Sequence, residues 1–298
     1  LMGVGTNILG YANKKVDTKV KDVIQKGNLT TLNCPEEVEF SKLIVKIHPW
    51  SKMVKFAKTG AEANAIAVRL ARAFNKKNKV IVCGYHGWHD WYLSSNIANT
   101  SNLNSHLMKN IPIDGVPKNL INTVFTFEYN NFDQLKKIVE KYKIGTIKME
   151  VKRNSEPKNN FLRNVRKLAS KKNIVLIFDE CTSGFRQTFG GLHKSYNVEP
   201  DIAIFGKALG NGYAINAIIG RRSVMEYAEQ SFISSTFWTE RIGPTAALET
   251  LKVMEKIKSW DQITLLGKKI KKRWANLARL YKLDLKIQGI DALPNFYF

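Results

Sequence analysis

A carboxylate and an amine follow two apolar segments, and together they could carry out covalent chemistry. The first segment, residues 174–178, is followed by Asp179 and Glu180, and the second, residues 202–205, leads to Lys207. Short, continuous apolar runs are typical of strands that are buried on both faces of a parallel sheet. Residues at the carboxyl ends of such strands line the ligand crevice. We therefore expect Asp179 and Lys207 at the same edge of one sheet.

Lys207 stands in a setting that suits a nucleophile. Gly206 precedes it, and the small-residue run 208–212 follows it, so another molecule can approach closely. A lysine at a buried edge loses solvation, which lowers its pKa towards the range where the free amine attacks a carbonyl carbon. Because a carboxylate can pair with a pyridinium nitrogen, Lys207 and Asp179 together favour pyridoxal phosphate. Charged residues also end strands in many proteins that have no cofactor.

A glycine turn between a predicted strand and a predicted helix could bind a phosphate. Residues 53–57 read as a strand, the sequence Lys-Thr-Gly-Ala-Glu-Ala-Asn follows at 58–64, and residues 65–72 are strongly helical. This arrangement offers backbone N–H groups and a helix N-terminus to an anion. The signal is weak by itself, since many α/β units have such a turn without a ligand.

Aromatic and histidine side chains follow the next predicted strand, residues 80–83. Tyr85 stands where its ring could cover a planar ligand, although packing of the aromatic residues as a lid is the better explanation of the cluster. The spacing of His86 and His89 suggests a metal site, but there is no convincing third ligand, and we expect no metal.

Composition indicates a globular protein with a large core. The chain has 298 residues, 44% of them hydrophobic, and a formal net charge of +22. Its lysines are spread over polar helix faces and no nucleic-acid module accompanies them, so we expect no nucleic-acid partner. The three cysteines form neither a disulfide framework nor a zinc pattern. No apolar run reaches the length of a membrane span, and we expect a cytoplasmic protein.

The order of predicted elements indicates an α/β fold. Strands alternate with helices from residue 50 to about residue 220, which predicts a mostly parallel sheet with crossover helices. The other predicted elements are a strand and turn at 2–11, helices at 16–25, 36–47, 132–141, 244–258 and 265–280, strands at 123–127, 145–149 and 217–220, a mobile loop at 94–117, and a strand pair starting at 285.

Eight short motifs occur in the order and roughly the spacing of one known family. They are Thr59-Gly60-Ala61-Glu62-Ala63, Tyr85-His86-Gly87, Glu150, Asp179-Glu180 through Gly184-Phe185-Arg186, Gly190-Gly191, Pro200-Asp201, Gly206-Lys207-Ala208 and Ser235-Thr236. The chain resembles the class III (subgroup II) aminotransferases, and within them the glutamate-1-semialdehyde 2,1-aminomutase branch. The resemblance covers essentially the whole chain and implies the fold-type I (aspartate aminotransferase-like) architecture of pyridoxal-phosphate enzymes.

The resemblance implies a role for each residue that contacts the cofactor ring. Lys207 would form the internal aldimine and later move the proton between the substrate carbon and the cofactor. Asp179 would keep the pyridine nitrogen protonated. Tyr85 would stack on one face of the ring, and Cys181 would contact the other face.

The resemblance also implies how the phosphate and the surrounding network are held. The backbone at Gly60 and Ala61 would bind the phosphate together with Thr236 of a second subunit, which requires a homodimer. Glu150 would order the network around it, through Tyr85 or His86, and His86 is assigned to the cofactor site.

The chain departs from the family pattern at several places. Glu150 is followed by Val151-Lys152 where Glu-Pro-Val is usual, and Trp238-Thr239-Glu240-Arg241 replaces a small-residue turn. Family members extend further at both ends, so we expect a truncated chain. The expected divisions are an N-terminal segment at 1–45, a large cofactor-binding domain at 46–258, and the start of an incomplete small α+β domain at 259–298.

The resemblance implies amino-group transfer with small-molecule donors and acceptors. The main expectation is an aminotransferase that works through the Lys207 aldimine and a pyridoxamine phosphate intermediate. An alternative is glutamate-1-semialdehyde 2,1-aminomutase, which exchanges the amino group within one molecule. An alternative of another class is an inactive truncated fragment or a basic binding protein.

Overall fold

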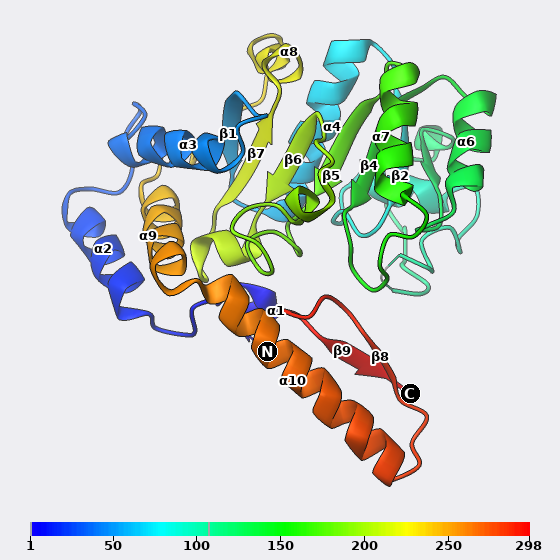
Figure 1. Cartoon of the computed structure of the whole chain (residues 1–298). Coiled ribbons are helices and arrows are strands. Elements are labelled where there is room, and N and C mark those ends of the chain that lie inside the picture. Colours follow the sequence, from blue (N-terminus) through cyan, green and yellow to red (C-terminus); the bar gives the residue numbers. More distant parts are fainter. Residues whose placement is uncertain (1, 107) are drawn as a thin grey trace.

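A seven-stranded sheet forms the centre of the molecule (Figure 1), seen in a computed structural model that describes residues 2–106 and 108–298. The strands are β1 (Met53–Ala57), β2 (Lys79–Cys83), β3 (Val124–Thr126), β4 (Ile144–Glu150), β5 (Val175–Asp179), β6 (Ile202–Phe205) and β7 (Asn216–Gly220). Their order is β1-β7-β6-β5-β4-β2-β3. The five strands from β6 to β3 are parallel, and β7 runs antiparallel to both of its neighbours. The predicted mostly parallel sheet is confirmed.

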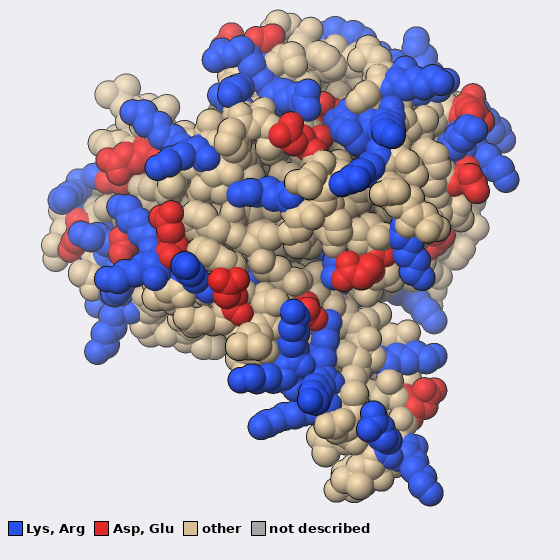
Figure 2. All heavy atoms as spheres, viewed as in Figure 1, with Lys and Arg blue, Asp and Glu red and all other residues tan. Residues whose placement is uncertain are grey.

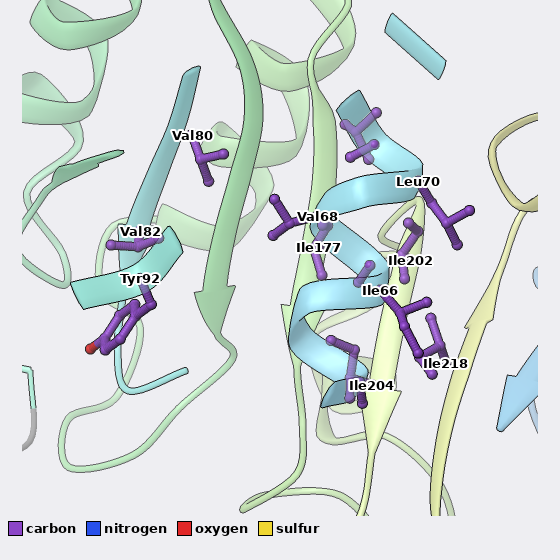
Figure 3. Packing of buried hydrophobic residues seen from close by; sticks show 14 of the residues in the cluster. Ile66, Val68, Leu70, Val80, Val82, Tyr92, Ile177, Ile202, Ile204 and Ile218 are labelled. Carbon is purple, nitrogen blue, oxygen red and sulfur yellow. The ribbon is translucent and has the colours of Figure 1, made fainter. Parts of the chain in front are cut away.

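Helix α4 (Gly60–Asn75) covers one face of this sheet. Its sequence is rich in alanine, which favours helix, and Thr59 caps its first turn by accepting a hydrogen bond from the N–H of Glu62. Ile66 and Leu70 point from the helix towards isoleucines of β6 and β7 (Figure 3). Burial of each such side chain stabilises the fold by about 1.5–3 kcal/mol, so this packing fixes the position of the α4 N-terminus.

Helices on the other face complete a three-layer arrangement. Helices α6 (Phe132–Lys141) and α7 (Phe161–Lys171) lie in front of the sheet in Figure 1. Leu135 and Val165 of these helices belong to the same buried cluster as Leu176 and Phe178 of β5. The central strands are therefore covered on both sides, as their continuous apolar sequences predict.

A group of helices covers the β1–β7 side of the sheet. These are α2 (Lys14–Gln25), α3 (Pro35–Ile47) and α9 (Ile242–Ile257), and Phe40 of α3 shares a buried cluster with Leu251 of α9. The remaining short elements are α1 (Met2–Gly5), α5 (Asp90–Leu93), α8 (Arg222–Met225) and the 3-10 helices η1 (Ser94–Asn96), η2 (Lys118–Leu120), η3 (Leu192–Tyr196), η4 (Lys207–Gly210) and η5 (Glu226–Gln230).

The C-terminal elements extend away from the sheet. Helix α10 (Ser259–Leu280) projects from the main body, and the antiparallel pair β8 (Lys286–Gln288) and β9 (Asn295–Tyr297) lies beside it (Figure 1). The strand pair predicted from residue 285 is confirmed. Helix α10 begins at Ser259, six residues before its predicted start at Leu265.

Two predicted segments differ from the structure. Residues 2–11, predicted as a strand and turn, form the helical turn α1 followed by further turns, because Gly3 and Val4 adopt left-handed backbone angles that no strand permits. The predicted loop at 94–117 starts as the 3-10 helix η1, with Ser94 and Leu103 buried. Residue 107 lies outside the described residues, and the mobility of this segment stays a prediction.

The surface charge is dispersed. Lys and Arg side chains are scattered across the visible face and along α10, with acidic side chains among them (Figure 2). None of the described helices combines the length and the apolar character needed to cross a membrane.

Candidate active site

The carboxyl ends of β2, β4 and β5 bring the predicted site residues to one edge of the sheet. Glu150 and Asp179 are direct neighbours across the β4–β5 pair. Strands β4 and β2 are neighbours in the sheet. The connection after β2 leads to β3 on one side of this pair, whereas the connection after β4 leads to β5 on the other side, so the two connections diverge between β4 and β2. Ligands of open α/β sheets bind at such a switch point. Tyr85 and His86 follow β2 at this point.

Asp179 is a buried carboxylate with a donor on each oxygen. His86 Nδ1 lies 2.9 Å from Asp179 Oδ2, and the N–H of Cys181 donates to Oδ1 at 3.1 Å. Burial would raise the pKa of Asp179, but the positive charge of Lys148 and the hydrogen bond from His86 outweigh burial and lower it. Burial lowers the pKa of His86 to about 4, so the imidazole is neutral and donates from Nδ1. Asp179 is therefore ionised at neutral pH.

Lys207 follows β6 in a strained backbone conformation. Its φ of 44° lies in the left-handed region, where a residue other than glycine is unfavourable, and such strain concentrates at functional sites. Its Nζ donates to Thr182 Oγ1 at 2.9 Å. Burial lowers the pKa of Lys207, and the positive charge of Arg153 lowers it further. The direction agrees with the sequence-based expectation of a nucleophilic amine.

The N-terminus of α4 offers two free donors at the same edge. Within the described part of the chain, no hydrogen bond engages the N–H of Gly60 or Ala61, because only later residues of the helix find partners in its own turns. The helix dipole adds positive potential there. These groups are suited to a phosphate.

Contacts around Cys181 show that the cofactor-site candidates converge. A Cβ added to Gly60 would lie 3.7 Å from Cys181 Sγ, and one added to Gly206 would lie 3.4 Å from the same sulfur. A Cβ added to Gly87 would lie 3.0 Å from the Cα of Ala61. The turn before α4, the segment after β2 and the lysine turn therefore meet around Cys181. Burial raises the pKa of the Cys181 thiol well above its usual value, so it is neutral.

Tyr85 is half-buried in this region. Its ring packs edge-on against Tyr92, with 6.1 Å between ring centroids. Its N–H lies 3.4 Å from Glu150 Oε2, which agrees with the predicted link between Glu150 and Tyr85. Gly84 has a φ of +117°, and a Cβ there would lie 2.6 Å from Glu150 Oε2, so only glycine allows this approach.

Glu150 has a second partner that the sequence did not reveal. Arg153 Nε and Nη2 donate to its two oxygens at 2.8 and 2.6 Å, a bidentate pair. Burial raises the pKa of Glu150, and Arg153 opposes this rise. Arg153 Nη2 also lies 3.5 Å from Thr182 Oγ1, so an unbroken series of polar contacts runs from Glu150 to Lys207.

Lys148 and Thr182 are further site residues that sequence reasoning missed. Lys148 Nζ lies 3.8 Å from Asp179 Oδ2, and its side chain is completely buried. In sequence, Lys148 stands inside a strand pattern, and no motif identifies it. The one available signal is a charged residue among the apolar residues of a buried strand, two positions before Glu150.

Thr236 is not joined to the other candidates. It is exposed in the turn at 236–239, and no hydrogen bond among the described residues connects it to Lys207 or Asp179. Trp238, two residues later, donates to Glu62 Oε1 at 3.2 Å, which ties this turn to the first turn of α4.

Two cavities differ in their relation to this edge. One of about 240 Å³ is lined by His106, Arg153, Thr182 and Gln288, and it adjoins the Thr182–Lys207 contact. A larger one of about 890 Å³ is lined by residues from the amino ends of β5 and β6, such as Val175. The larger cavity lies at the opposite edge of the sheet from Lys207. The smaller one is the candidate substrate cavity because it is lined by Thr182, and a further cavity of about 290 Å³, lined by Glu150 and Arg153, lies at the same edge.

The residues present suit pyridoxal phosphate. The free N–H groups of Gly60 and Ala61 can hold its phosphate, the ionised Asp179 can pair with its ring nitrogen, and Lys207 supplies an amine. No single one of these features is specific, but together they correspond to the three functional groups of this cofactor.

The sequence is similar to those of known proteins. The sequence model of the family described as aminotransferase class-III matches residues 1–293. The 3-aminobutyryl-CoA aminotransferase of Cloacimonas acidaminovorans is 34% identical, over 100% of this chain and 70% of its own length. The glutamate-1-semialdehyde 2,1-aminomutase of Archaeoglobus fulgidus is 30% identical, over 100% of this chain and 72% of its own.

Solved structures share the fold. The FumI protein of Sphingopyxis sp. MTA144, solved in its PLP internal aldimine form, superimposes with a TM-score of 0.89 at 21% identity, over 100% of this chain and 70% of its own. The acetylornithine aminotransferase of Elizabethkingia anophelis superimposes with a TM-score of 0.79 at 24% identity, over 99% of this chain and 73% of its own. The fold is therefore fold-type I. The chain belongs to the class-III aminotransferase family, and it is an enzyme whose cofactor is pyridoxal phosphate.

Proposed function

We propose that this protein transfers an amino group between two small molecules and that Lys207 is its catalytic amine. The observation that carries the proposal is the position of Lys207, desolvated and strained at the sheet edge that also presents Asp179. The main candidate reaction is intermolecular transamination, the type of reaction that the name of the similar aminotransferase of Cloacimonas acidaminovorans indicates.

The side chains have separable tasks in this proposal. When bound, pyridoxal phosphate supplies a carbonyl that accepts amino groups and a ring that accepts electrons. Gly60 and Ala61 hold the phosphate with their N–H groups, and Asp179 pairs with the ring nitrogen. Lys207 takes up and returns a proton at Nζ, which Thr182 Oγ1 positions at 2.9 Å. The lowered pKa of Lys207 makes its neutral form accessible.

The remaining candidates shape the site around these groups. We infer that Tyr85 covers one face of the ring and Cys181 contacts the other. Glu150 and His86 keep the network in place, since His86 donates to Asp179 and Glu150 accepts from Tyr85. The half-buried position of Tyr85 and the closeness of Cys181 to Gly60 support these roles.

Absorbance with candidate donors tests the proposal. The protein loaded with pyridoxal phosphate should change its visible spectrum when glutamate, alanine or a diamine is added, and the effective compound identifies the donor. Lys207→Ala should abolish turnover, whereas Lys136→Ala, at an exposed position on α6, should leave it unchanged. Turnover retained in a folded Lys207→Ala variant would refute the assignment.

Intramolecular amino exchange is the second candidate. Several similar proteins, including those of Archaeoglobus fulgidus and Nitrosopumilus maritimus, are named glutamate-1-semialdehyde 2,1-aminomutase. Under this alternative, glutamate-1-semialdehyde alone changes the spectrum, and the simple amino donors have no effect. A response to glutamate or alanine excludes it in favour of transamination.

We further propose a homodimer in which Thr236 of one subunit binds the cofactor phosphate of the other. The exposure of Thr236 supports this arrangement, because a residue that serves another subunit must be accessible in the single chain. The division at residues 45 and 258 also stays a proposal, supported by the projection of α10 from the sheet domain. The cytoplasmic location stays a prediction.

A further inference from the structure

Lys148 is a fully buried lysine that the proposed reaction does not use. It lies in β4 with its side chain 0% exposed, and no hydrogen bond engages its Nζ within the described part of the chain. Because side chains alternate along a strand, Lys148 shares a face with Thr146 and Glu150, and this face lies under α4. Its nearest carboxylate is Asp179, 3.8 Å from Nζ.

Of the charged and titratable groups near Lys148, Asp179 remains as its partner for an ion pair. Glu150, the other carboxylate nearby, is already paired with Arg153 through two hydrogen bonds. His86 is neutral and donates to Asp179, and the Cys181 thiol is neutral because burial raises its pKa. The buried residues of α4 that face the sheet include no titratable side chain.

A buried ammonium without a counter-charge is very unfavourable. Burial lowers the pKa of Lys148 and the charge of Asp179 opposes this fall, so Lys148 carries its charge only beside an ionised Asp179. Two unit charges about 4 Å apart interact strongly even when partly screened. The carboxylate that faces the ring nitrogen in the proposed function therefore already faces an amine that it holds in the charged form. A protonated ring nitrogen would be the second cation beside the same carboxylate.

We propose that Lys148 is a positioning residue that sets the protonation of the cofactor ring nitrogen by competing with it for the charge of Asp179. The inference rests on the proposed placement of the ring nitrogen at Asp179. Repulsion between the two cations makes the protonated ring less favourable, and the displaced proton goes to solvent. Lys148 thus weakens the ring as an electron acceptor and couples cofactor binding to pH.

The test is the ¹⁵N chemical shift of pyridoxal phosphate labelled at the ring nitrogen and bound to the full chain, followed against pH. In Lys148→Met, a change that removes the charge and keeps an unbranched side chain, the apparent pKa of the ring nitrogen should rise by at least about one unit, a tenfold change in protonation. Lys148→Gln serves as a second uncharged variant if the first folds poorly. Thr146→Val, on the same face of β4, is the matched control and should titrate like the wild type.

Two outcomes separate this inference from the proposed function. If Asp179→Asn changes the ring titration but both Lys148 variants titrate like the wild type, the Lys148 inference is wrong and the cofactor placement stands. If Asp179→Asn also leaves the titration of the ring nitrogen unchanged, the proposed placement of the ring nitrogen at Asp179 is itself wrong. A raised pKa of the ring nitrogen in both Lys148 variants, with Thr146→Val titrating like the wild type, supports the inference, because a structural disturbance alone would not raise this pKa in both uncharged variants.

Discussion

Lys207 and Asp179 reach their chemical state through different physical effects. Burial removes solvent from Lys207 and lowers its pKa, while its left-handed backbone keeps it at the end of β6. Asp179 is more deeply buried than Lys207, but donors and a nearby cation keep it ionised. One sheet edge thus supplies an amine that can lose its proton and a carboxylate that has already lost its own.

Substitution of Tyr85 tests the stacking role at the residue scale. Tyr85→Ala should weaken the affinity for pyridoxal phosphate by about tenfold, because a stacked aromatic pair contributes about 0.5–1.5 kcal/mol beyond its buried area. Tyr85→Phe keeps the ring and should bind the cofactor nearly as well as the wild type. Equilibrium titration by absorbance measures both, and equal affinities of Tyr85→Ala and wild type would refute stacking.

The residues found from sequence and those missed differ in the information they require. Lys207, Asp179 and Tyr85 could be predicted because each follows an apolar strand and belongs to a motif. Lys148 could not, because its role depends on which strand pairs with β4 and in which register. Only the pairing of Glu150 with Asp179 shows that Lys148 and Asp179 share a face.

At the element scale, the site depends on helices that hold loops in place. His48, at the C-terminal end of α3, donates from Nδ1 to the carbonyl of Ile44 and accepts from the N–H of Gly191 at Nε2, at 3.0 and 2.9 Å. Glu180, next to Asp179, accepts from the N–H of Leu192. These contacts fix the segment after the site to α3 and β5.

Acid should loosen the attachment of α3, because protonation of His48 Nε2 breaks its bond to Gly191. Burial lowers the pKa of His48 to about 3 in the folded protein, against about 6.5 for an unperturbed histidine. The unfolded chain therefore binds more protons between these values, and stability is lost as pH falls through this range. The loss from this group is at most about 1.4 kcal/mol per pH unit.

Denaturant-induced unfolding, followed at a series of pH values, measures this loss of stability. His48→Gln should flatten the dependence of the unfolding free energy on pH between about 6.5 and 3, although the variant starts from a lower stability. Above pH 7.5 both proteins should show little dependence from this site. An equally steep acid loss in the variant would show that His48 is not responsible.

Prediction of elements from sequence succeeded where periodicity was strong. The strand at 53–57 and the helix at 132–141 match β1 and α6 residue for residue. The N-terminal segment failed because its glycines permit left-handed angles that a hydrophobicity pattern does not reveal. The antiparallel direction of β7 could not be predicted either, since strand direction depends on the path of the connection from β6.

At the scale of the whole molecule, the proposed dimer makes each site dependent on two chains. Mixing Lys207→Ala with Thr236→Val should restore activity that both separate variants lack or lose in part. In a mixed dimer, one site combines the intact Lys207 of one chain with the intact Thr236 of the other. Subunits should be exchanged under mild denaturation and the activity compared with unmixed samples. Absence of any restoration, with mixed dimers demonstrated by mass, would contradict the shared site.

Covalent trapping at Lys207 tests the central claim most directly. The full chain loaded with pyridoxal phosphate is reduced with borohydride, digested and analysed by mass spectrometry. Because Lys207 combines a lowered pKa with its position beside Thr182 at the site edge, the cofactor should be found attached to Lys207 Nζ. Attachment to Lys148 or to scattered surface lysines, with Lys207 unmodified, would contradict the account.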